Sequence, residues 1–476
     1  MAQQAQKLPK VSIQKFGGSC LINAASFQKI ADILNMYKDD HEIICVASAL
    51  NGVTDRLIKL AESAKNPDLC DQIIAEIECR HFTIADEIFS EEDAENYYIA
   101  VENYVEKRFE EIENTLSEIQ EFGMKSYYLD NVVSNGEKLS TFMLSSYLQY
   151  KGFETQFYTG EELIITDDNF FNALPLFKEV QYRVEKKLKP LILDPQVELI
   201  FCVTGFIGRN MVGNTTTLGR GGSDFTATIL AHALYDTKAA SEIKVIFWKD
   251  VDGILATDPK YVKGARLVPK MSYDEAKELA FFGAKILHPK CLAAVEKKAI
   301  PIEIRNFDKP QSKIYSQIGP DTDEGTIKGI SMLPAVQMIS VNSGALVEIP
   351  GVLAKIFQTV ADAGVSVSMV SQSSSEVNTT FVVGDKDGPK AVNALKEDPF
   401  FKLYFDVTSD PVAVVAVVGK AIPNSSIKAR IYKALGDAKI NSIAVAQSSD
   451  GMNISIVVKR ELLKEAVTKI YEEFKI

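Results

Sequence analysis

The sequence predicts an α/β protein in which a mainly parallel sheet carries helices on both faces and is followed by two smaller βαββαβ modules. Three observations support this prediction. The chain begins with a strand, a glycine turn, a helix and a strand, then alternates apolar runs with helical stretches, and ends with two copies of one pattern. We therefore expect a flexible tail at 1–10, a large α/β domain at 11–328 and a pair of modules at 329–476.

The first elements follow from apolar spacing. VSIQKF (11–16) is apolar and β-forming and ends at a Gly-Gly pair, and residues 24–37 repeat apolar side chains at helical spacing. EIICVAS (42–48) is a continuous apolar run, which is typical of a strand covered on both faces. Acidic and apolar residues alternate over 68–119 with little Gly or Pro, so long solvated helices are expected there.

Later strands are shorter. The runs LILD, LIFCVTGF and KVIFWKDVDG after residue 189 predict strands, and the stretch DFTATILAHAL between the last two predicts a helix. Near residue 330 the pattern changes to an internal repeat. VSVSMVSQSSSEVNTTFVV and INSIAVAQSSDGMNISIVV align around a shared QSS, and each follows a strand and a helix. The period of roughly 70–75 residues and the two copies favour a paired module over a repeat array.

Composition excludes several classes of protein. Lys and Arg number 52 and Asp and Glu 64, so the formal charge is 52 − 64 = −12, which disfavours a nucleic-acid partner. Apolar residues at 46% and charged residues at 24% exclude general disorder. Without an apolar run of about 18 residues we expect no membrane span. The N-terminus lacks the apolar core of a signal, and the six cysteines have no metal-ligand spacing. We expect a cytoplasmic protein with no resident metal.

Three glycine-rich segments are candidates for binding anions. KFGGS (15–19), TGFIG (204–208) and TTTLGRGGSD (215–224) each follow a predicted strand, and the first and third lead into helices. Backbone N–H groups at such turns, with the helix dipole, favour phosphate or carboxylate. A single Gly-Gly pair is more often only a tight turn, whereas the ten-residue run with embedded charges favours a site. No GxxxxGK[ST] or GxGxxG occurs, which excludes a P-loop enzyme and a dinucleotide fingerprint.

Charged residues beside these turns suit phosphoryl transfer, which needs cations around the phosphates and an acceptor held in line. Lys15 and Lys285 are candidate phosphate cations, Arg220 a candidate for a substrate carboxylate, and Glu137 a candidate for an ammonium group. Each alone is more often a solvated surface charge. Their placement beside glycine turns favours the functional interpretation.

Taken in order from residue 11, the motifs KFGGS, VASALNGVTDRL, VSNGEKLS, TGFIG, TTTLGRGGSDFTA, KDVDGILATDP and FGAKILHP resemble those of aspartate kinases, members of the amino-acid kinase superfamily. The resemblance implies an amino-acid-kinase sandwich, and the C-terminal repeat resembles the tandem ACT domains that sense amino acids. It further implies ATP- and Mg²⁺-dependent phosphorylation of the side-chain carboxylate of L-aspartate to 4-phospho-L-aspartate. That reaction is the first step toward lysine, threonine and methionine.

The resemblance also implies roles for single residues. Lys15 and Asp224 match the catalytic pair. The substrate positions are Ser48, Thr54, Glu137, Arg220 and Ser223. The ATP positions are Lys15, Gly17, Gly18, Ser19, Lys249, Asp250, Asp258, Lys260 and Lys285. The sequence departs from the family at Cys20, at Leu255 where a tyrosine is common, and at Lys260, which replaces an arginine and loses its fork geometry.

The ACT resemblance implies an effector site. Amides suited to an amino-acid effector are Gln372 and Asn378 in the first copy and Gln447 and Asn453 in the second. The second copy lacks the glycines of the first copy's turn, so we expect it to bind weakly or not at all. The QSSSE context resembles threonine-responsive members, which favours threonine as inhibitor, with lysine as the alternative. Pairing of ACT domains implies a homodimer or homotetramer; the alternative is that both copies serve only to pair subunits.

Two rival functions remain from the sequence. One is an amino-acid kinase of the same fold that phosphorylates glutamate or a relative, and the other is a catalytically silent amino-acid sensor. Glu137 and Arg220 in their full motifs, together with the ACT pair, argue against the first rival. The joint presence of Lys15, Glu137, Arg220 and Asp224 argues against the second. We expect no fused homoserine dehydrogenase, since no dinucleotide-binding domain precedes the end at Ile476.

Overall fold

A computed structural model describes residues 8–281, 287–320, 327–343, 350–373 and 378–476. The chain divides into two compact units, Met1–Ile254 with Leu287–Pro320, and Leu255–Ile286 with Asp321–Ile476. The tail predicted at 1–10 lies mostly outside the described residues, and the first strand already begins at Lys10. The two units are described in turn.

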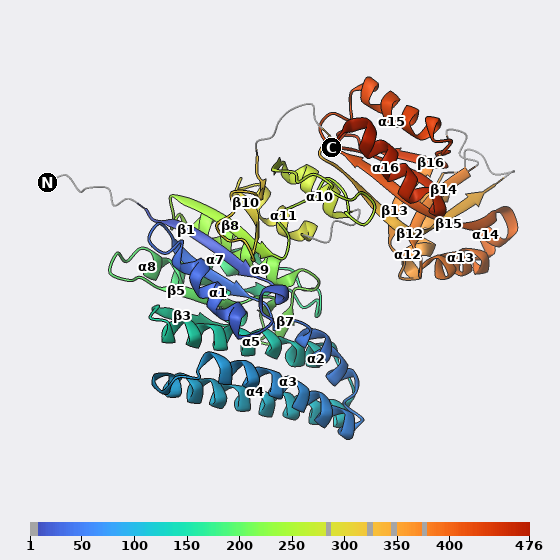
Figure 1. Cartoon of the computed structure of the whole chain (residues 1–476). Helices are drawn as coiled ribbons and strands as arrows, with labels where there is room; N and C mark the ends of the chain where they lie inside the picture. The colour runs from blue at the N-terminus through green and yellow to red at the C-terminus, as the bar shows by residue number, and fades with distance from the viewer. Residues whose placement is uncertain (1–7, 282–286, 321–326, 344–349, 374–377) are drawn as a thin grey trace. The chain divides into compact units, whose positions relative to one another are not determined.

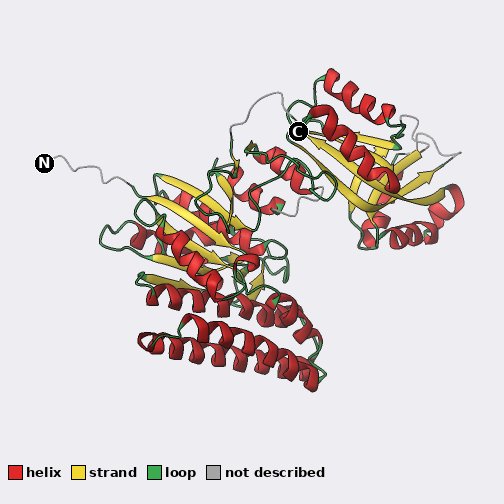
Figure 2. Ribbon diagram, in the orientation of Figure 1, coloured by secondary structure: helices red, strands yellow, loops and turns green. Residues whose placement is uncertain are grey.

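The first unit is built on a mainly parallel sheet, as predicted (Figures 1 and 2). Its strands lie in the order β3-β5-β2-β1-β8-β10-β11, and every neighbouring pair is parallel except β10 with β11. The bounds are β1 (Lys10–Phe16), β2 (Glu42–Ala47), β3 (Thr155–Tyr158), β5 (Ile200–Thr204), β8 (Glu242–Lys249), β10 (Ile302–Asn306) and β11 (Ser316–Ile318). A small sheet, β4 (Ile165–Thr166), β6 (Ile207–Asn210) and β7 (Thr215–Thr217), lies in the order β4-β6-β7.

Helices cover both faces of the main sheet because strand side chains alternate between faces. Lys15 of β1 points to α9, while its neighbour Phe16 packs with residues of α1 and α5. The helices of the first unit are α1 (Ala24–Asn35), α2 (Val53–Glu62), α3 (Pro67–Ile88), α4 (Glu95–Phe122), α5 (Ser126–Tyr150), α6 (Gly160–Leu163), α7 (Phe177–Lys187), α8 (Lys189–Ile192), α9 (Gly222–Thr237) and α11 (Pro289–Glu296). The α9 side also holds α7 and α11.

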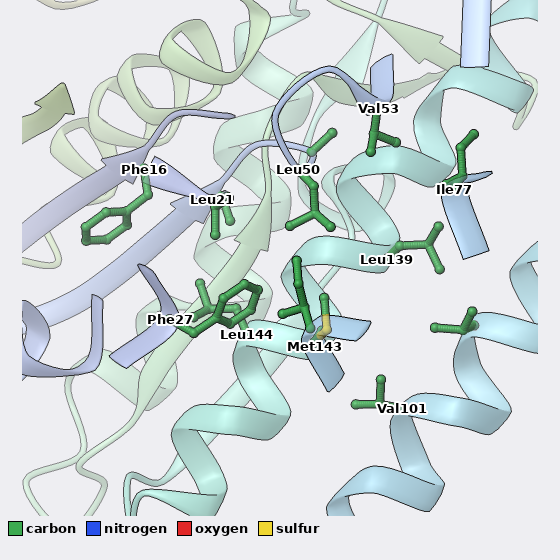
Figure 3. Packing of buried hydrophobic residues seen from close by; sticks show 14 of the residues in the cluster. Phe16, Leu21, Phe27, Leu50, Val53, Ile77, Val101, Leu139, Met143 and Leu144 are labelled. Atoms are coloured by element: carbon green, nitrogen blue, oxygen red, sulfur yellow. The ribbon is translucent and has the colours of Figure 1, made fainter. Parts of the chain in front are cut away.

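A large apolar core joins the sheet to the α5 side (Figure 3). Phe16 and Leu21 meet Phe27 of α1 and Met143 of α5, and the same cluster continues outward through Ile77 of α3. The long helices α3 and α4 therefore form an outer layer packed on α5. Among the described residues, no helix is both long and apolar enough to cross a membrane.

One strand prediction was wrong. LILD does not form a strand; α8 occupies Lys189–Ile192 instead. Pro190 stands in the first turn of this helix, where its missing N–H would be unpaired in any case and its fixed φ suits the helix. A run of three apolar residues fits a strand or a buried helix equally well, so apolar content alone could not decide.

The second unit holds a six-stranded antiparallel sheet in the order β13-β14-β12-β15-β17-β16. Its strands are β9 (Lys270–Met271), outside that sheet, and β12 (Gly329–Asn342), β13 (Val367–Gln372), β14 (Asn378–Gly384), β15 (Asp406–Val418), β16 (Ala444–Gln447) and β17 (Asn453–Lys459). Its helices are α10 (Tyr273–Phe281), α12 (Val352–Asp362), α13 (Gly388–Glu397), α14 (Pro399–Tyr404), α15 (Ser425–Asp437) and α16 (Leu463–Phe474).

The two predicted modules share their long strands. The second half of β12 pairs with β14, whereas its first half pairs with the end of β15 beside β17. A register shift between Leu333 and Val336, around Pro334, separates the two halves. Each module thus completes its βαββαβ pattern with half of the other module's first strand.

Residues 255–286 are grouped with the C-terminal residues, although the sequence analysis assigned them to the N-terminal domain. Backbone contacts explain this grouping. The N–H of Ile330 donates to the carbonyl of Ala256 at 2.6 Å, and the Ser331 hydroxyl donates to the carbonyl of Leu279 in α10 at 3.0 Å. The backbone N–H of Lys420 donates to Glu275 at 3.3 Å. These contacts attach α10 to β12 and to the residues after β15.

Buried His81 of α3 makes the stability of the protein depend on pH. Its Nδ1–H donates to the carbonyl of Ile77 at 2.7 Å, and its Nε2 is buried with no hydrogen-bond partner among the described residues. Burial lowers the pKa of His81 to about 4, so the unfolded chain binds the proton first as the pH falls below 6.5, the ordinary pKa of histidine. The unfolding free energy that neutral His81 contributes is therefore fully present above pH 6.5 and is lost as the pH falls toward 4.

We expect the natural chain to lose about 2 kcal/mol of unfolding free energy from this group between pH 7 and pH 5. His81→Leu removes the titrating group and should reduce the loss by that amount. Urea unfolding of both proteins at the two pH values measures it. Equal losses in the two proteins would contradict the assignment.

Candidate active site

The predicted site residues of the first unit lie at the carboxyl ends of its parallel strands. Lys15 and Lys249 stand at the ends of neighbouring strands β1 and β8, and Ser48 and Thr204 stand at the ends of β2 and β5. The chain runs from β1 to β2 on one side and later from β8 to β10 on the other, so the strand order reverses between β1 and β8. Such a switch point at the carboxyl edge is where open α/β sheets bind ligands.

Asp224 joins the two lysines. Its Oδ1 lies 2.7 Å from Lys15 Nζ and its Oδ2 accepts a hydrogen bond from Lys249 Nζ at 2.8 Å. The three side chains are between 7% and 17% exposed, so water screens them weakly. Two ammonium groups and one carboxylate leave one net positive charge at the end of the sheet, which suits a polyphosphate.

Protonation states follow from this arrangement. Burial acts to raise the pKa of Asp224, but Lys15 and Lys249 outweigh it and hold that pKa at about 2. Burial is the largest influence on Lys15 and lowers its pKa, which Asp224 offsets only in part. Burial also acts to lower the pKa of Lys249, but the charge and hydrogen bond of Asp224, together with weaker influences of Cys291 and Cys20, outweigh it and raise that pKa. The carboxylate is therefore ionised at neutral pH.

The N-terminus of α9 brings Asp224 to this point. The turn after β5 approaches the helix so closely that a Cβ on Gly205 would lie 2.5 Å from Ser223 Cβ. Gly221 at the N-cap has φ 71° and supplies no side-chain cap. The Gly222 N–H donates to the Gly219 carbonyl at 2.9 Å, so among the described residues the N–H groups of Ser223 and Asp224 keep their capacity for a ligand. An anion at this end of the helix is also favoured by the dipole.

Glu137 supplies a second buried charge. It lies on α5, is 3% exposed, and has one carboxylate oxygen, Oε2, with no hydrogen-bond partner in the described part of the chain. Burial raises the pKa of Glu137 to about 8, against the opposing influence of the Ala49 N–H and of Lys15. A buried, unsatisfied carboxylate is costly, and a ligand ammonium group would satisfy it.

The structure places the predicted residues in three groups. The carboxyl edge of the first unit and the turns around it carry Lys15, Gly17, Gly18, Ser19, Ser48, Thr54, Glu137, Arg220, Ser223, Asp224, Lys249 and Asp250. Asp258 and Lys260 are exposed in the second unit, where the Lys260 N–H donates to Asp258 at 2.9 Å. Lys285 lies outside the described residues.

The predicted effector amides stand at strand ends in the second unit. Gln372 ends β13, Asn378 begins β14 and Gln447 ends β16, and all three are exposed. Asn453, at the start of β17, is buried and donates from Nδ2 to Glu278 of α10. The two copies therefore differ: of the two amides of the second copy, Asn453 is already engaged within the protein.

Sequence reasoning missed the ion pair of Lys249, which was expected only to contact ATP, and it missed Asp130. This carboxylate of α5 is fully buried and accepts three hydrogen bonds from the segments around Phe171 and Thr217. The visible signal was its spacing: seven residues, or about two helical turns, before Glu137 on the same helix face.

Comparison with known families agrees with this fold. The model of the amino acid kinase family matches residues 10–306, more than half of the chain, and the model of the ACT domain matches 339–398 and 415–474. The chain belongs to the amino acid kinase family and carries two ACT domains.

Its relatives are aspartokinases. Aspartokinase 2 of Arabidopsis thaliana is 29% identical over 97% of this chain and 84% of the relative. The bifunctional aspartokinase/homoserine dehydrogenase of Buchnera aphidicola is 28% identical over 97% of this chain and 56% of the relative. The chain thus spans about half the length of the bifunctional curated relatives that it matches.

Solved structures agree over nearly the whole chain. Escherichia coli aspartokinase III in complex with aspartate and ADP superposes with a TM-score of 0.81 at 25% identity, covering 98% of this chain and 100% of that one. The same protein in complex with lysine and aspartate gives a TM-score of 0.79 at 25% identity, covering 98% and 99%.

The shared carboxylate predicts a stability effect. Asp224→Asn leaves two buried ammonium groups without a counter-ion and should lower the unfolding free energy by about 3–5 kcal/mol. Adding Lys249→Met removes one of those charges and should restore part of the loss. Urea unfolding of the parent, D224N, K249M and D224N/K249M gives a double-mutant cycle for this ion pair. An additive double variant would contradict the shared ion pair.

Proposed function

We propose that the protein is an aspartate kinase that transfers the γ-phosphoryl group of ATP to the side-chain carboxylate of L-aspartate. The observation that carries the proposal is the buried Lys15–Asp224–Lys249 group at the carboxyl edge of the sheet. Phosphoryl transfer depends on positioning and on charge stabilisation, and this group offers both without a covalent nucleophile. Lys15 stabilises the charge on the transferring phosphoryl group, and Asp224 holds the lysines in place.

The amino-acid substrate is held at its two other groups. Glu137 binds the ammonium group of the substrate. Arg220 is exposed in the loop before α9 and forms a bidentate ion pair with the α-carboxylate of the substrate. Ser48, Thr54 and Ser223 line the same edge. With both ends of the substrate held, the side-chain carboxylate is left to attack the γ-phosphate in line. The acyl phosphate forms as the bond from the γ-phosphorus to the ADP oxygen breaks.

Mg²⁺ enters as part of the substrate MgATP. The described residues include no cluster of three metal-ligating side chains, and Asp224 is neutralised by its lysines. Phosphate oxygens are therefore the main ligands of the ion. Gly17, Gly18 and Ser19 after β1, together with Lys249 and Asp250, are the residues of the first unit that we assign to ATP.

Feedback control is assigned to the ACT domains, with threonine favoured as inhibitor and lysine as the alternative. The first copy is the better effector site. Its helix α12 has Gly351 at the N-cap with no side-chain cap, whereas the side chain of Asn424 caps α15 by accepting from the Ser426 N–H at 2.9 Å. In the second copy, Asn453 is already bound to Glu278. Gln372 and Asn378 are the expected contacts.

As the sequence analysis predicts, we assign catalysis to residues 11–328 and regulation to residues 329–476. We also propose a cytoplasmic enzyme that assembles as a homodimer or homotetramer through its ACT domains.

A coupled assay of ADP release tests the activity. With MgATP and L-aspartate we expect turnover that requires aspartate. Adding threonine, or in the alternative lysine, should lower it about 5- to 150-fold, as typical coupling energies allow. Turnover with L-glutamate in place of aspartate would support the rival amino-acid kinase. Absence of turnover together with calorimetric binding of an effector would identify a silent sensor.

Glu137 predicts how the aspartate KM depends on pH. Since the pKa of Glu137 is about 8, the carboxyl group is mostly protonated at pH 6 and must lose its proton before it can bind an ammonium group. The aspartate KM should therefore fall about tenfold between pH 6 and pH 7 and then level off above pH 8. Glu137→Gln should raise the KM and abolish this fall. An unchanged profile in E137Q would exclude the assigned role, and the MgATP KM serves as the control.

A further inference from the structure

Asp130 is a buried carboxylate that the proposed chemistry does not use. It lies on α5 with 0% exposure, two turns before Glu137. Its Oδ2 accepts hydrogen bonds from the Thr217 N–H at 2.8 Å and from the Phe171 N–H at 2.9 Å, and its Oδ1 accepts from the Thr217 hydroxyl at 2.9 Å. One side chain thus connects α5 to two separate segments of the chain.

Both of these segments border the loop that bears Arg220. Thr217 ends β7, and Leu218 to Gly221 connect it to α9. Gly219 in this loop has φ 76°, and a Cβ placed on it would lie 2.8 Å from Asn172 Oδ1 and 3.1 Å from the Phe171 carbonyl oxygen. The segment that Asp130 holds through Phe171 is therefore the surface against which the loop packs.

The other anchors of the loop depend less on α5. The Leu218 N–H donates to the Phe206 carbonyl at 2.9 Å, and Gly221 lies so close to His288 that a Cβ would be 2.7 Å from its Cβ. These contacts fix the two ends of the loop to the turn after β5 and to the residue before α11. Asp130 therefore connects both the start of the loop and its packing surface directly to the helix that carries Glu137.

A purely structural role does not require a charge here. Burying a carboxylate costs more free energy than burying an amide or an apolar group of similar size. Burial raises the pKa of Asp130 to about 6, yet its three hydrogen bonds keep it ionised at neutral pH. The charge strengthens the bonds to the two backbone N–H groups and fixes their geometry.

We propose that Asp130 is a positioning residue that sets the distance between Arg220 and Glu137, and with it the affinity for amino acids that carry both an ammonium and an α-carboxylate group. This inference rests on the proposed function, because Arg220 and Glu137 are assigned there to the two ends of the substrate. It concerns the amino-acid side of the site and leaves the phosphate side, at Lys15 and Lys249, unaffected.

Steady-state kinetics of Asp130→Ala test the proposal. We expect the aspartate KM to rise about tenfold or more, since small displacements of positioning groups have effects of this size, and the MgATP KM to stay within about twofold. Asp130→Asn should recover only part of the loss, because its carbonyl oxygen still accepts from both N–H groups but without the negative charge that strengthens these bonds. If D130A does not fold, Thr217→Val, which removes one donor, should still raise the aspartate KM alone.

Ser145→Ala is the matched control. Ser145 is buried on the same helix and its hydroxyl shares a hydrogen bond of 2.8 Å with that of Thr155, away from the loop. S145A should lower stability in urea and leave both KM values unchanged. If D130A or T217V raises both KM values equally, or neither, the role assigned to Asp130 is overturned.

A second readout does not depend on turnover. Arg220 is exposed, and trypsin cleaves after arginine, so a loosened loop should be cut faster at this bond. We expect the fragment ending at Arg220 to appear several-fold faster from D130A than from S145A or the parent, measured by mass spectrometry. Equal cleavage rates in the three proteins would overturn the inference that Asp130 fixes the position of the loop. If the parent enzyme does not phosphorylate aspartate but D130A is cut faster, the proposed function fails while the positioning role stands.

Discussion

The ion pairs of Asp224 are the constraint on which the rest of the site depends. Lys15 and Lys249 end neighbouring parallel strands, so their ammonium groups would repel each other in a poorly hydrated place without a shared counter-ion. Asp224 can serve both only if α9 begins directly over the ends of these strands. The glycine turn after β5 allows that approach, and the N–H groups of Ser223 and Asp224 in the first turn of α9 lie at the same edge.

Helix α5 is the second organiser of the site. It carries Glu137 and Asp130 on one face, packs its apolar side on the sheet, and is covered from outside by α3 and α4. Burial on all sides explains why its carboxylates have raised pKa values. A rigid, fully packed helix suits a residue that must bind a substrate group at a fixed place.

The second unit shows how two small modules become one sheet. Each long strand, β12 and β15, contributes one half to either module, so neither module completes its sheet alone. Helix α10 belongs to the same unit through its contacts with β12 and with Asn453. The engaged amide of Asn453 and the capped start of α15 distinguish the second copy from the first, which leaves the first copy better suited to an effector.

The sequence by itself determined the parallel sheet, the repeat and most of the candidate site, because glycine turns at strand ends and apolar runs are local patterns. It misassigned LILD, since a short apolar run fits both helix and strand. It suggested Lys15, Glu137, Arg220 and Asp224 through their motifs. Only the tertiary structure decided that Lys249 shares Asp224 and that Asp130 holds the Arg220 loop. Both are contacts between residues far apart in the chain, and they arise from how strands and helices pack rather than from any local spacing.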